Sequence, residues 1–500
     1  MKNRNQSRRD FLKKTALGTT AVGLNTGSYA QIITLNEGPY FGNGFHNGWA
    51  DQNSIVIWTR LTKNPEMNFN GKEFIEISGE KHRELWEIAD EEEIYQSQIP
   101  AGYDLDEMIG ACPGADGEVR LRYYPENKPN AAKEISWTKV DPEKNFTTQW
   151  QLRNLTPDTK YAVELEARAG TSANTTNTLK GNFCTPPAVE SSKDISFCIV
   201  TCHDFIRKDS PKGHQMYQAM LQQAPDFYVH TGDIEYYDKP RPYALTEKLM
   251  HFKWDRIFAL PHQRNFYNQT TTYFLKDDHD TLCNDAYQGM TYGTVSFERG
   301  IEIFDKEQFP SNDKPYKTVR WGKDLQIWLM EGRNFRSKNT DPDGPDKTIW
   351  GKEQKQWLFN TLEASDAAFK VIISPTPILG PDRKNKHDNY ANDNFDYEGD
   401  EIRDFINQYD NIFMCNGDRH WQYVTHWENT NLWEFGCGPG SDEHAGGWSQ
   451  DNKLPEHQFL RVKGGFLTGR VAQENGVPIL KFQHFDIKGN KVHEKTFKKE

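Results

Sequence analysis

The residue types best able to do chemistry in this 500-residue chain stand directly after four short apolar runs. The four groups are Cys202-His203-Asp204, Asp233 with Tyr236, Asp277 to Asp280, and Asp418 with His420. Thiols, phenols, imidazoles and carboxylates are the side chains that bind metal ions. Carboxylates brought together in a desolvated pocket would repel one another strongly unless cations neutralised them. The pattern therefore predicts a metal site.

The apolar runs that precede these groups predict buried strands. They span residues 195–200, 227–230, 272–275 and 412–415, and two further runs span 325–330 and 370–374. Helical stretches are expected at 215–223, 243–259 and 352–362. Strands alternating with helices predict an α/β core whose site lies at the carboxyl ends of the strands. We expect the four groups to lie along one rim of one sheet.

The region before this core has a different pattern. Residues 38–188 contain short alternating strands, with a charged insertion at 79–117. Leu155 to Tyr161 is similar to the turn that introduces a late strand in immunoglobulin-like sandwiches. We therefore expect a small all-β domain over 38–188, a linker, and a second domain over 194–497 that ends in hairpins.

Composition narrows the functional classes. The chain carries 60 Lys and Arg against 72 Asp and Glu, a formal net charge of -12. An acidic chain does not favour a nucleic-acid backbone as its main partner, so nucleic acid enters only as a candidate substrate. No stretch approaches the ~18 apolar residues of a membrane helix, so no transmembrane segment is expected.

The first thirty residues are expected to be an export signal rather than part of the folded domains. Arg8-Arg9 is followed by Phe11-Leu12-Lys13, a weakly apolar stretch and the small-x-small sequence Ser28-Tyr29-Ala30. This resembles a twin-arginine signal peptide over residues 1–30. It predicts the twin-arginine export machinery as a partner and a periplasmic or secreted location. The seven cysteines are an odd number, so at least one cannot pair within the chain.

Three motifs resemble one known family. They are Gly-Asp-x-x-Tyr at 232–236, Asp-Asp-His-Asp at 277–280 and Gly-Asp-x-His at 417–420. They are similar to the signature of calcineurin-like metallophosphoesterases, and more closely to that of the alkaline phosphatase D (PhoD) group. The segment Trp58 to Leu61 also resembles the β-domain that precedes the catalytic domain in that group. The resemblance implies an α/β (α+β) sandwich of two mixed sheets flanked by helices, preceded by a small immunoglobulin-like β-domain.

The same resemblance implies the metals and their ligands. Members of this type hold one ferric iron together with one or two calcium ions. Other divalent metals stay open as alternatives for this chain. The iron ligands map to Cys202, Asp233 and Tyr236. Asp278 and Asp418 are candidate calcium ligands, with Asp233 bridging to that side. His420 is a further ligand whose metal is not assigned.

The resemblance also implies a reaction. A metal-bound hydroxide would attack phosphorus in a small-molecule or polymeric phosphoester, either a monoester or a diester. His279 would protonate the departing alkoxide or stabilise its charge. Arg333 and Arg336 match an Arg-x-x-Arg element and would bind phosphate oxygens.

Two other classes of function stay open: a hydrolase of another oxyanion ester such as sulfate, and a non-catalytic, metal-stabilised polysaccharide-binding protein. The sequence departs from the group at three positions. His203 stands where many relatives have Gln, Asp280 stands where Glu is more usual, and Glu235 would add a third anion near the iron. Residues 380–399 and 436–447, which include His444, are expected to be loops, either at the rim of the site or elsewhere on the surface.

Overall fold

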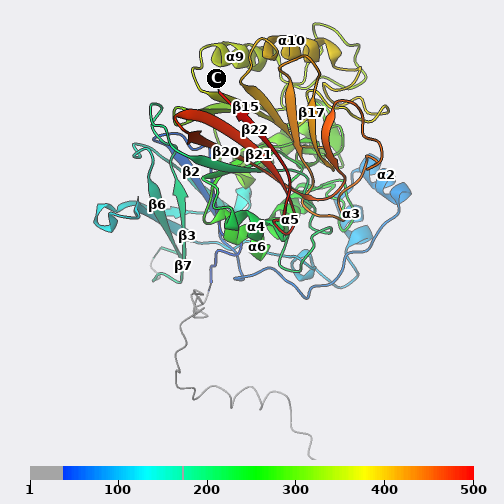
Figure 1. Cartoon of the computed structure of the whole chain (residues 1–500). Helices are drawn as coiled ribbons and strands as arrows, with labels where there is room; N and C mark the ends of the chain where they lie inside the picture. Colours follow the sequence, from blue (N-terminus) through cyan, green and yellow to red (C-terminus); the bar gives the residue numbers. More distant parts are fainter. Residues whose placement is uncertain (1–37, 172–173, 500) are drawn as a thin grey trace, which may run out of the picture. The chain divides into compact units, whose positions relative to one another are not determined.

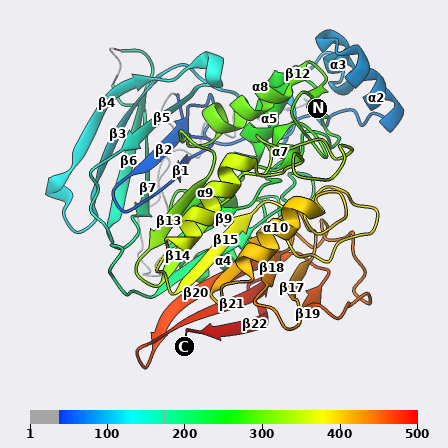
Figure 2. The same cartoon turned by 90° about the horizontal axis from the view of Figure 1, so that it is seen from above.

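Two mixed β-sheets face each other (Figures 1 and 2), and the four groups of candidate residues follow strands of these sheets. The computed structural model describes residues 38–171 and 174–499, and the described residues belong to one compact unit that begins at Gly38. The signal peptide predicted for residues 1–30 lies outside the described residues. Among the described residues, no helix combines the length and the apolar character needed to cross a membrane.

The first sheet has six strands. In spatial order they are β10 (Thr271–Phe274), β9 (Phe227–His230), β8 (Ile195–Val200), β20 (Gly465–Glu474), β21 (Val477–Asp486) and β22 (Lys491–Lys498). β8, β9 and β10 run parallel, so their carboxyl ends meet at one edge. β20 pairs antiparallel with β8, and the turn between β20 and β21 falls at Asn475-Gly476.

The second sheet has seven strands. In spatial order they are β13 (Lys317–Trp321), β14 (Leu325–Leu329), β15 (Phe369–Ser374), β16 (Ile412–Asn416), β18 (Trp433–Cys437), β17 (Gln422–His426) and β19 (His457–Arg461). β14, β15, β16 and β18 are parallel. All five residues of β16 are buried, as expected of a strand covered on both faces.

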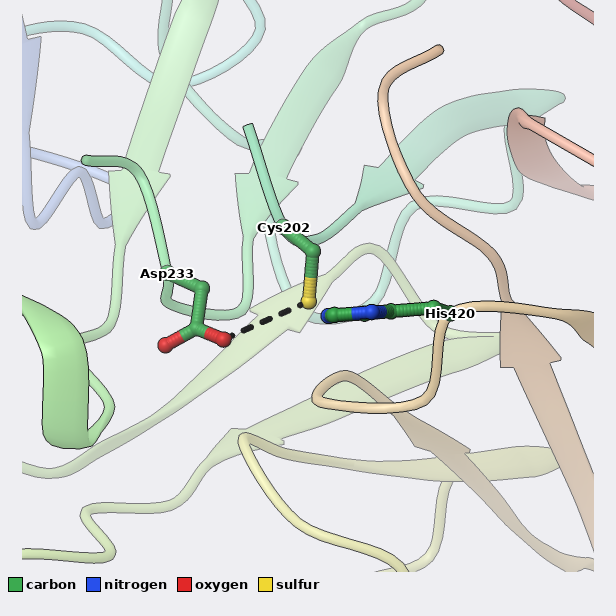
Figure 3. A group of neighbouring side chains, drawn as sticks. All are labelled: Cys202, Asp233 and His420. Carbon is green, nitrogen blue, oxygen red and sulfur yellow. Dashed lines mark hydrogen bonds between the residues drawn. The ribbon is translucent and has the colours of Figure 1, made fainter. Parts of the chain in front are cut away.

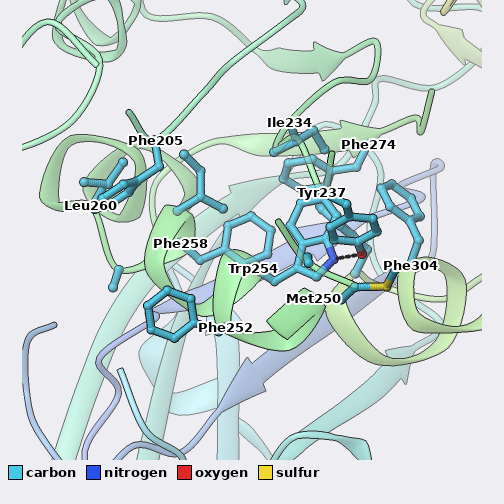
Figure 4. Close-up of a cluster of buried hydrophobic side chains, with 14 of the residues drawn as sticks. Phe205, Ile234, Tyr237, Met250, Phe252, Trp254, Phe258, Leu260, Phe274 and Phe304 are labelled. Atoms are coloured by element: carbon cyan, nitrogen blue, oxygen red, sulfur yellow. Dashed lines mark hydrogen bonds between the residues drawn. The ribbon is translucent and has the colours of Figure 1, made fainter. Parts of the chain in front are cut away.

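Helices cover the outer faces of both sheets. α9 (Lys352–Glu363) and α10 (Asp396–Ile406) pack on the seven-stranded sheet through a cluster that includes Trp328 and Ile372. The helices near the six-stranded sheet are α4 (Met216–Gln222), α5 (Glu247–Phe258) and α6 (Pro261–Tyr267). Around α5, Trp254 stacks on Phe258 and its indole donates a hydrogen bond to Tyr237 (Figure 4). The remaining helices are α2 (Gly79–Ile88), α3 (Glu91–Gln98), α7 (Asp278–Thr281) and α8 (Phe297–Glu302).

The region before the linker forms two antiparallel sheets. One contains β1 (Phe45–Gly48), β2 (Ile55–Arg60) and β5 (Thr147–Leu152), and the other contains β4 (Lys133–Lys139), β3 (Glu118–Pro125), β6 (Lys160–Arg168) and β7 (Asn177–Cys184). A two-stranded pair, β11 (Thr291–Tyr292) and β12 (Val295–Ser296), lies elsewhere. Side chains of the three-stranded and four-stranded sheets share one apolar core with the six-stranded and seven-stranded sheets. The boundary between domains at 188–194 and an immunoglobulin-like topology stay predictions.

The structure confirms a mixed α/β fold but corrects the expectation of one sheet. β8, β9 and β10 belong to the six-stranded sheet, whereas β16, which precedes Asp418, belongs to the seven-stranded sheet. The two sheets meet at the site, where Thr201 forms an isolated parallel bridge with Pro439. Strands buried on both faces are apolar throughout, so their sequences do not reveal which sheet they join.

Candidate metal centre

Three candidate ligands share an unusual backbone conformation at a strand end. Cys202 follows β8, Asp233 follows β9 and Asp418 follows β16, with φ angles of 52°, 56° and 60°. Residues with side chains seldom adopt this left-handed region, and such strain is common where a side chain must be aimed at a functional site. The chain therefore turns sharply after each strand and directs a thiol or carboxylate into one pocket.

The pocket joins the thiol, a carboxylate, the phenol and an imidazole. The Cys202 Sγ lies 3.4 Å from the Asp233 Oδ2, and the Tyr236 hydroxyl lies 3.0 Å from the same oxygen. The Tyr236 hydroxyl is also 3.2 Å from the His420 Nε2. Ligand atoms of Cys202, Asp233 and His420 all lie within 4.8 Å of one another, and their side chains point toward a common point (Figure 3).

Asp233 also belongs to two neighbouring groups. One contains Asp278 and His279, and the other contains Asp277 and Asp418, each with its ligand atoms within 4.8 Å. The sequence included Asp277 in one of the four groups but assigned only Asp278 and Asp418 as ligands. Asp277 stands three residues after the end of β10, and this position after a strand was a usable signal.

Buried polar atoms in this pocket fit bound cations. Burial raises the pKa of the Cys202 thiol, and the charges of Asp233 and Asp418 raise it further. Burial and the charge of Asp233 likewise raise the pKa of Tyr236. The Asp233 Oδ1 and Asp277 Oδ2 are buried without a hydrogen-bond partner among the described residues. Cations would satisfy these oxygens and keep the thiol and phenol deprotonated, so the donor set suits a metal.

Asp280 holds the turn that carries Asp233. Its Oδ2 accepts hydrogen bonds from the backbone N–H of Asp233 at 2.5 Å and of Asp277 at 3.0 Å. Its Oδ1 accepts from Ile234 at 2.8 Å and from Glu235 at 3.3 Å. One buried carboxylate thus joins the loops after β9 and β10.

His279 has an ionic partner that the sequence did not reveal. Its Nδ1 lies 2.6 Å from the Asp238 Oδ1. Burial lowers the pKa of His279, but the charges of Asp238, Asp278 and Asp233 outweigh it and raise the pKa to about 10. The imidazole ring also lies 4.2 Å from the Tyr236 ring, centroid to centroid, which places it at the edge of the pocket.

The two candidate arginines differ in their contacts. Arg333 is buried, and its Nε and Nη2 lie 2.6 Å and 2.5 Å from the Asp277 Oδ1. Arg336 is also buried and donates to the Asp388 carbonyl, but its Nε and Nη1 have no partner among the described residues. Arg333 is thus committed to an ion pair, while Arg336 keeps free donors. A role for either in binding phosphate stays a prediction.

The expected third anion is paired elsewhere. The Glu235 Oε1 lies 2.9 Å from the Arg256 Nη2 and 3.7 Å from the Lys253 Nζ, and all three side chains are buried. The charge of Glu235 is therefore balanced by two cations, and nothing in this arrangement requires it as a metal ligand.

A fourth group with metal-ligand residue types lies outside the pocket. It contains Glu247, His251 and Glu307. Arg299 pairs with both glutamates, at 2.6 Å from the Glu247 Oε1 and 2.5 Å from the Glu307 Oε1. The arginine already neutralises these carboxylates, so this group is an ion-pair network.

Solved structures similar to this chain share its fold. A structure of PhoD matches with a TM-score of 0.67 and 16% identity, over 95% of this chain and 92% of that one. A purple acid phosphatase from yellow lupin (Lupinus luteus) seeds matches with a TM-score of 0.59 and 11% identity, over 92% and 75%.

Comparison of sequences agrees with this fold. The family model described as PhoD-like phosphatase matches residues 303–475. Alkaline phosphatase D of Bacillus subtilis (strain 168) is 21% identical over 532 aligned residues, which cover 92% of this chain and 80% of that protein. In sequence and in fold, the chain is similar to PhoD-like phosphatases. These similarities support a phosphoric ester hydrolase.

The family match covers only part of the pocket. It includes Arg333, Arg336, Asp418 and His420, whereas residues 202–280 precede it. It also includes His444, a buried residue that the sequence placed in a loop, either at the rim of the site or elsewhere on the surface. The His444 ring lies 4.4 Å from the His420 ring and 5.1 Å from the Tyr236 ring, and both of its nitrogens lack a hydrogen-bond partner among the described residues.

We predict that Asp280→Asn weakens metal binding by about 10- to 100-fold, as loss of a residue that orients metal ligands typically does. An amide has one acceptor oxygen, so backbone N–H groups of the two loops lose their partner. Metal content after dialysis and thermal melting measure the effect. Asp226→Asn is the matched control, because Asp226 bonds the Ser196 N–H at the opposite end of β8 and β9. Parent-like metal affinity in Asp280→Asn would contradict the assignment.

Proposed function

We propose that this chain is an exported, metal-dependent hydrolase of phosphate monoesters and diesters. The observation that carries the proposal is the pocket around Asp233, where a thiol, a phenol, an imidazole and three further aspartates surround one carboxylate. The family match over residues 303–475 and the similarity to alkaline phosphatase D support the phosphoester as substrate. The twin-arginine pattern at residues 1–30 supports export to the periplasm or the outside of the cell.

We infer that the pocket holds ferric iron and calcium. Cys202, Asp233 and Tyr236 would hold the iron, with His420 near enough to join them, because anionic sulfur and oxygen ligands favour the ferric state. Asp233 would also face calcium together with Asp418 and either Asp277 or Asp278, since calcium takes carboxylate oxygens. When bound, the cations lower the pKa of water and offset the charge on the phosphoryl oxygens.

The chain's own residues then position the substrate and move a proton. Arg336 has two unpaired donors, which would bind phosphoryl oxygens, whereas Arg333 fixes Asp277. His279, oriented through its Nδ1 by Asp238, leaves its Nε2 to protonate the departing alkoxide or to stabilise its charge.

Asp233→Asn tests the enzymatic proposal. The variant removes an anionic oxygen shared by three groups of ligands, so turnover of phosphate monoesters and diesters should fall by roughly 10³-fold or more. Melting temperature and circular dichroism check that the variant is folded. Undiminished rates would contradict the proposal, and a parent protein that cleaves sulfate esters faster than phosphate esters would favour the sulfatase alternative.

Cys202→Ser tests the iron. A thiolate and phenolate bound to ferric iron give the native protein a visible charge-transfer absorption, and loss of the thiolate should shift or remove it. Cys198→Ser is the matched control, because Cys198 lies buried in β8 and outside every candidate group of ligands. Colourless, iron-free protein with full activity would refute the assignment of iron.

Asp238→Asn tests the role of His279. Loss of the orienting carboxylate should lower kcat by about 10²- to 10⁴-fold for alkyl esters, whose leaving group needs a proton. The effect on p-nitrophenyl esters should be much smaller, because p-nitrophenolate leaves without protonation. Equal decreases in kcat for both kinds of ester would show that His279 does not assist the leaving group.

A further inference from the structure

Two partly exposed arginines lie near the chain segments that carry Cys202 and His420. The side chain of Arg207 is 35% exposed, and its Nε lies 3.5 Å from the Asp204 Oδ2. The side chain of Arg383 is 30% exposed, and its Nε lies 3.5 Å from the Asp382 Oδ1. Asp204, the partner of Arg207, is two residues after Cys202, and Arg383 lies over the ring of Trp421, the residue after His420.

Arg383 is fixed beside the chain that carries His420. Its guanidinium lies 5.7 Å from the ring centroid of Trp421, the residue after His420. It also lies against Gly447, where an added Cβ would approach the Arg383 Nη1 to 2.9 Å. The neighbouring Gly446 N–H donates a hydrogen bond of 3.1 Å to the His420 carbonyl. Arg383 is therefore held at the rim by packing, and the absence of a side chain at Gly447 makes the room for it.

Neither of these two arginines is closely paired with a carboxylate of the described residues. The Oδ2 of Asp382, the nearest carboxylate to Arg383, lies 2.6 Å from the Arg419 Nη2 and accepts a 2.7 Å bond from Asn389. In the described part of the chain, neither the Arg383 nor the Arg207 guanidinium donates a hydrogen bond. In contrast, the buried Arg333 and Arg419 are paired at 2.5 Å and 2.6 Å.

We propose that Arg383, assisted by Arg207, binds a second anionic group on the substrate, beyond the phosphate that is cleaved. This inference rests on the proposed function. A guanidinium with unpaired donors binds a phosphate or carboxylate through two parallel hydrogen bonds. In a chain with a net charge of -12, local cations at the rim also concentrate anionic substrates at the pocket. The substrate class is therefore phosphoesters that carry a further phosphate or carboxylate.

Three esters that release the same leaving group test this subsite. They are ethyl p-nitrophenyl phosphate and its analogues with a terminal carboxylate or a terminal phosphate on the ethyl group. The parent protein should have a lower KM for one or both anionic analogues than for the ethyl ester, and the two analogues distinguish carboxylate from phosphate. Arg383→Gln should raise the KM of the preferred analogue by about tenfold, with kcat and the KM of the ethyl ester changed less than about twofold.

Lys384→Gln is the matched control, because it removes an equal charge from an exposed neighbour in the same loop. It should leave the KM of all three esters within about twofold of the parent. Arg207→Gln should also raise the KM of the preferred anionic analogue more than that of the ethyl ester, but by a smaller factor. This second variant shows whether the effect of Arg383→Gln comes merely from misfolding. Equal KM values for the three esters in the parent, or an equal change for all three in Arg383→Gln, would overturn the subsite. No turnover of any ester by the parent protein would instead contradict the proposed function.

Discussion

The structure depends on a concentration of buried negative charge around Asp233. In the absence of cations, burial and neighbouring carboxylates raise the pKa of Asp233, of the Cys202 thiol and of the Tyr236 phenol together. A protein gains no stability from such a pocket, because unpaired ionisable groups are costly to bury. Bound metal ions reverse this balance, since they favour the deprotonated ligands and satisfy the free oxygens. The most economical explanation of the pocket is therefore that it is built for cations.

The fold supplies the convergence of these groups. Parallel strands in each sheet bring their carboxyl ends to one edge, and the two edges meet where Thr201 pairs with Pro439. Left-handed backbone at Cys202, Asp233 and Asp418 then directs each side chain inward. Asp280 stabilises the turn after β9, because its carboxylate accepts hydrogen bonds from backbone N–H groups that are not paired in a strand. The strained turns and the buried carboxylate of Asp280 therefore act together to orient the candidate ligands.

The sequence predicted most of the elements, because buried strands are apolar and turn residues follow them. The strand at 195–200 and the helix at 352–362 agree closely with β8 and α9. It did not predict α10, whose stretch is rich in acidic residues and contains Gly399. It also placed every ligand on one sheet, because strands covered on both faces lack the alternation that would identify their partners. Sheet membership depends on pairing between distant segments, which composition does not encode.

In the site, the sequence found residues by type and missed those that act through geometry. Cys202, Asp233 and Asp418 were visible because each follows an apolar run. Asp238 and Asp280 were not assigned roles, since one acts through an imidazole and the other through backbone N–H groups.

The most direct test of the account is a crystal structure of the native protein with anomalous scattering measured at the iron edge. The account predicts an iron peak in bonding contact with the Cys202 Sγ, the Tyr236 hydroxyl and Asp233, and a second cation between Asp233 and Asp418. Native crystals without a cation at Asp233, or with the metal bound by other residues, would contradict it.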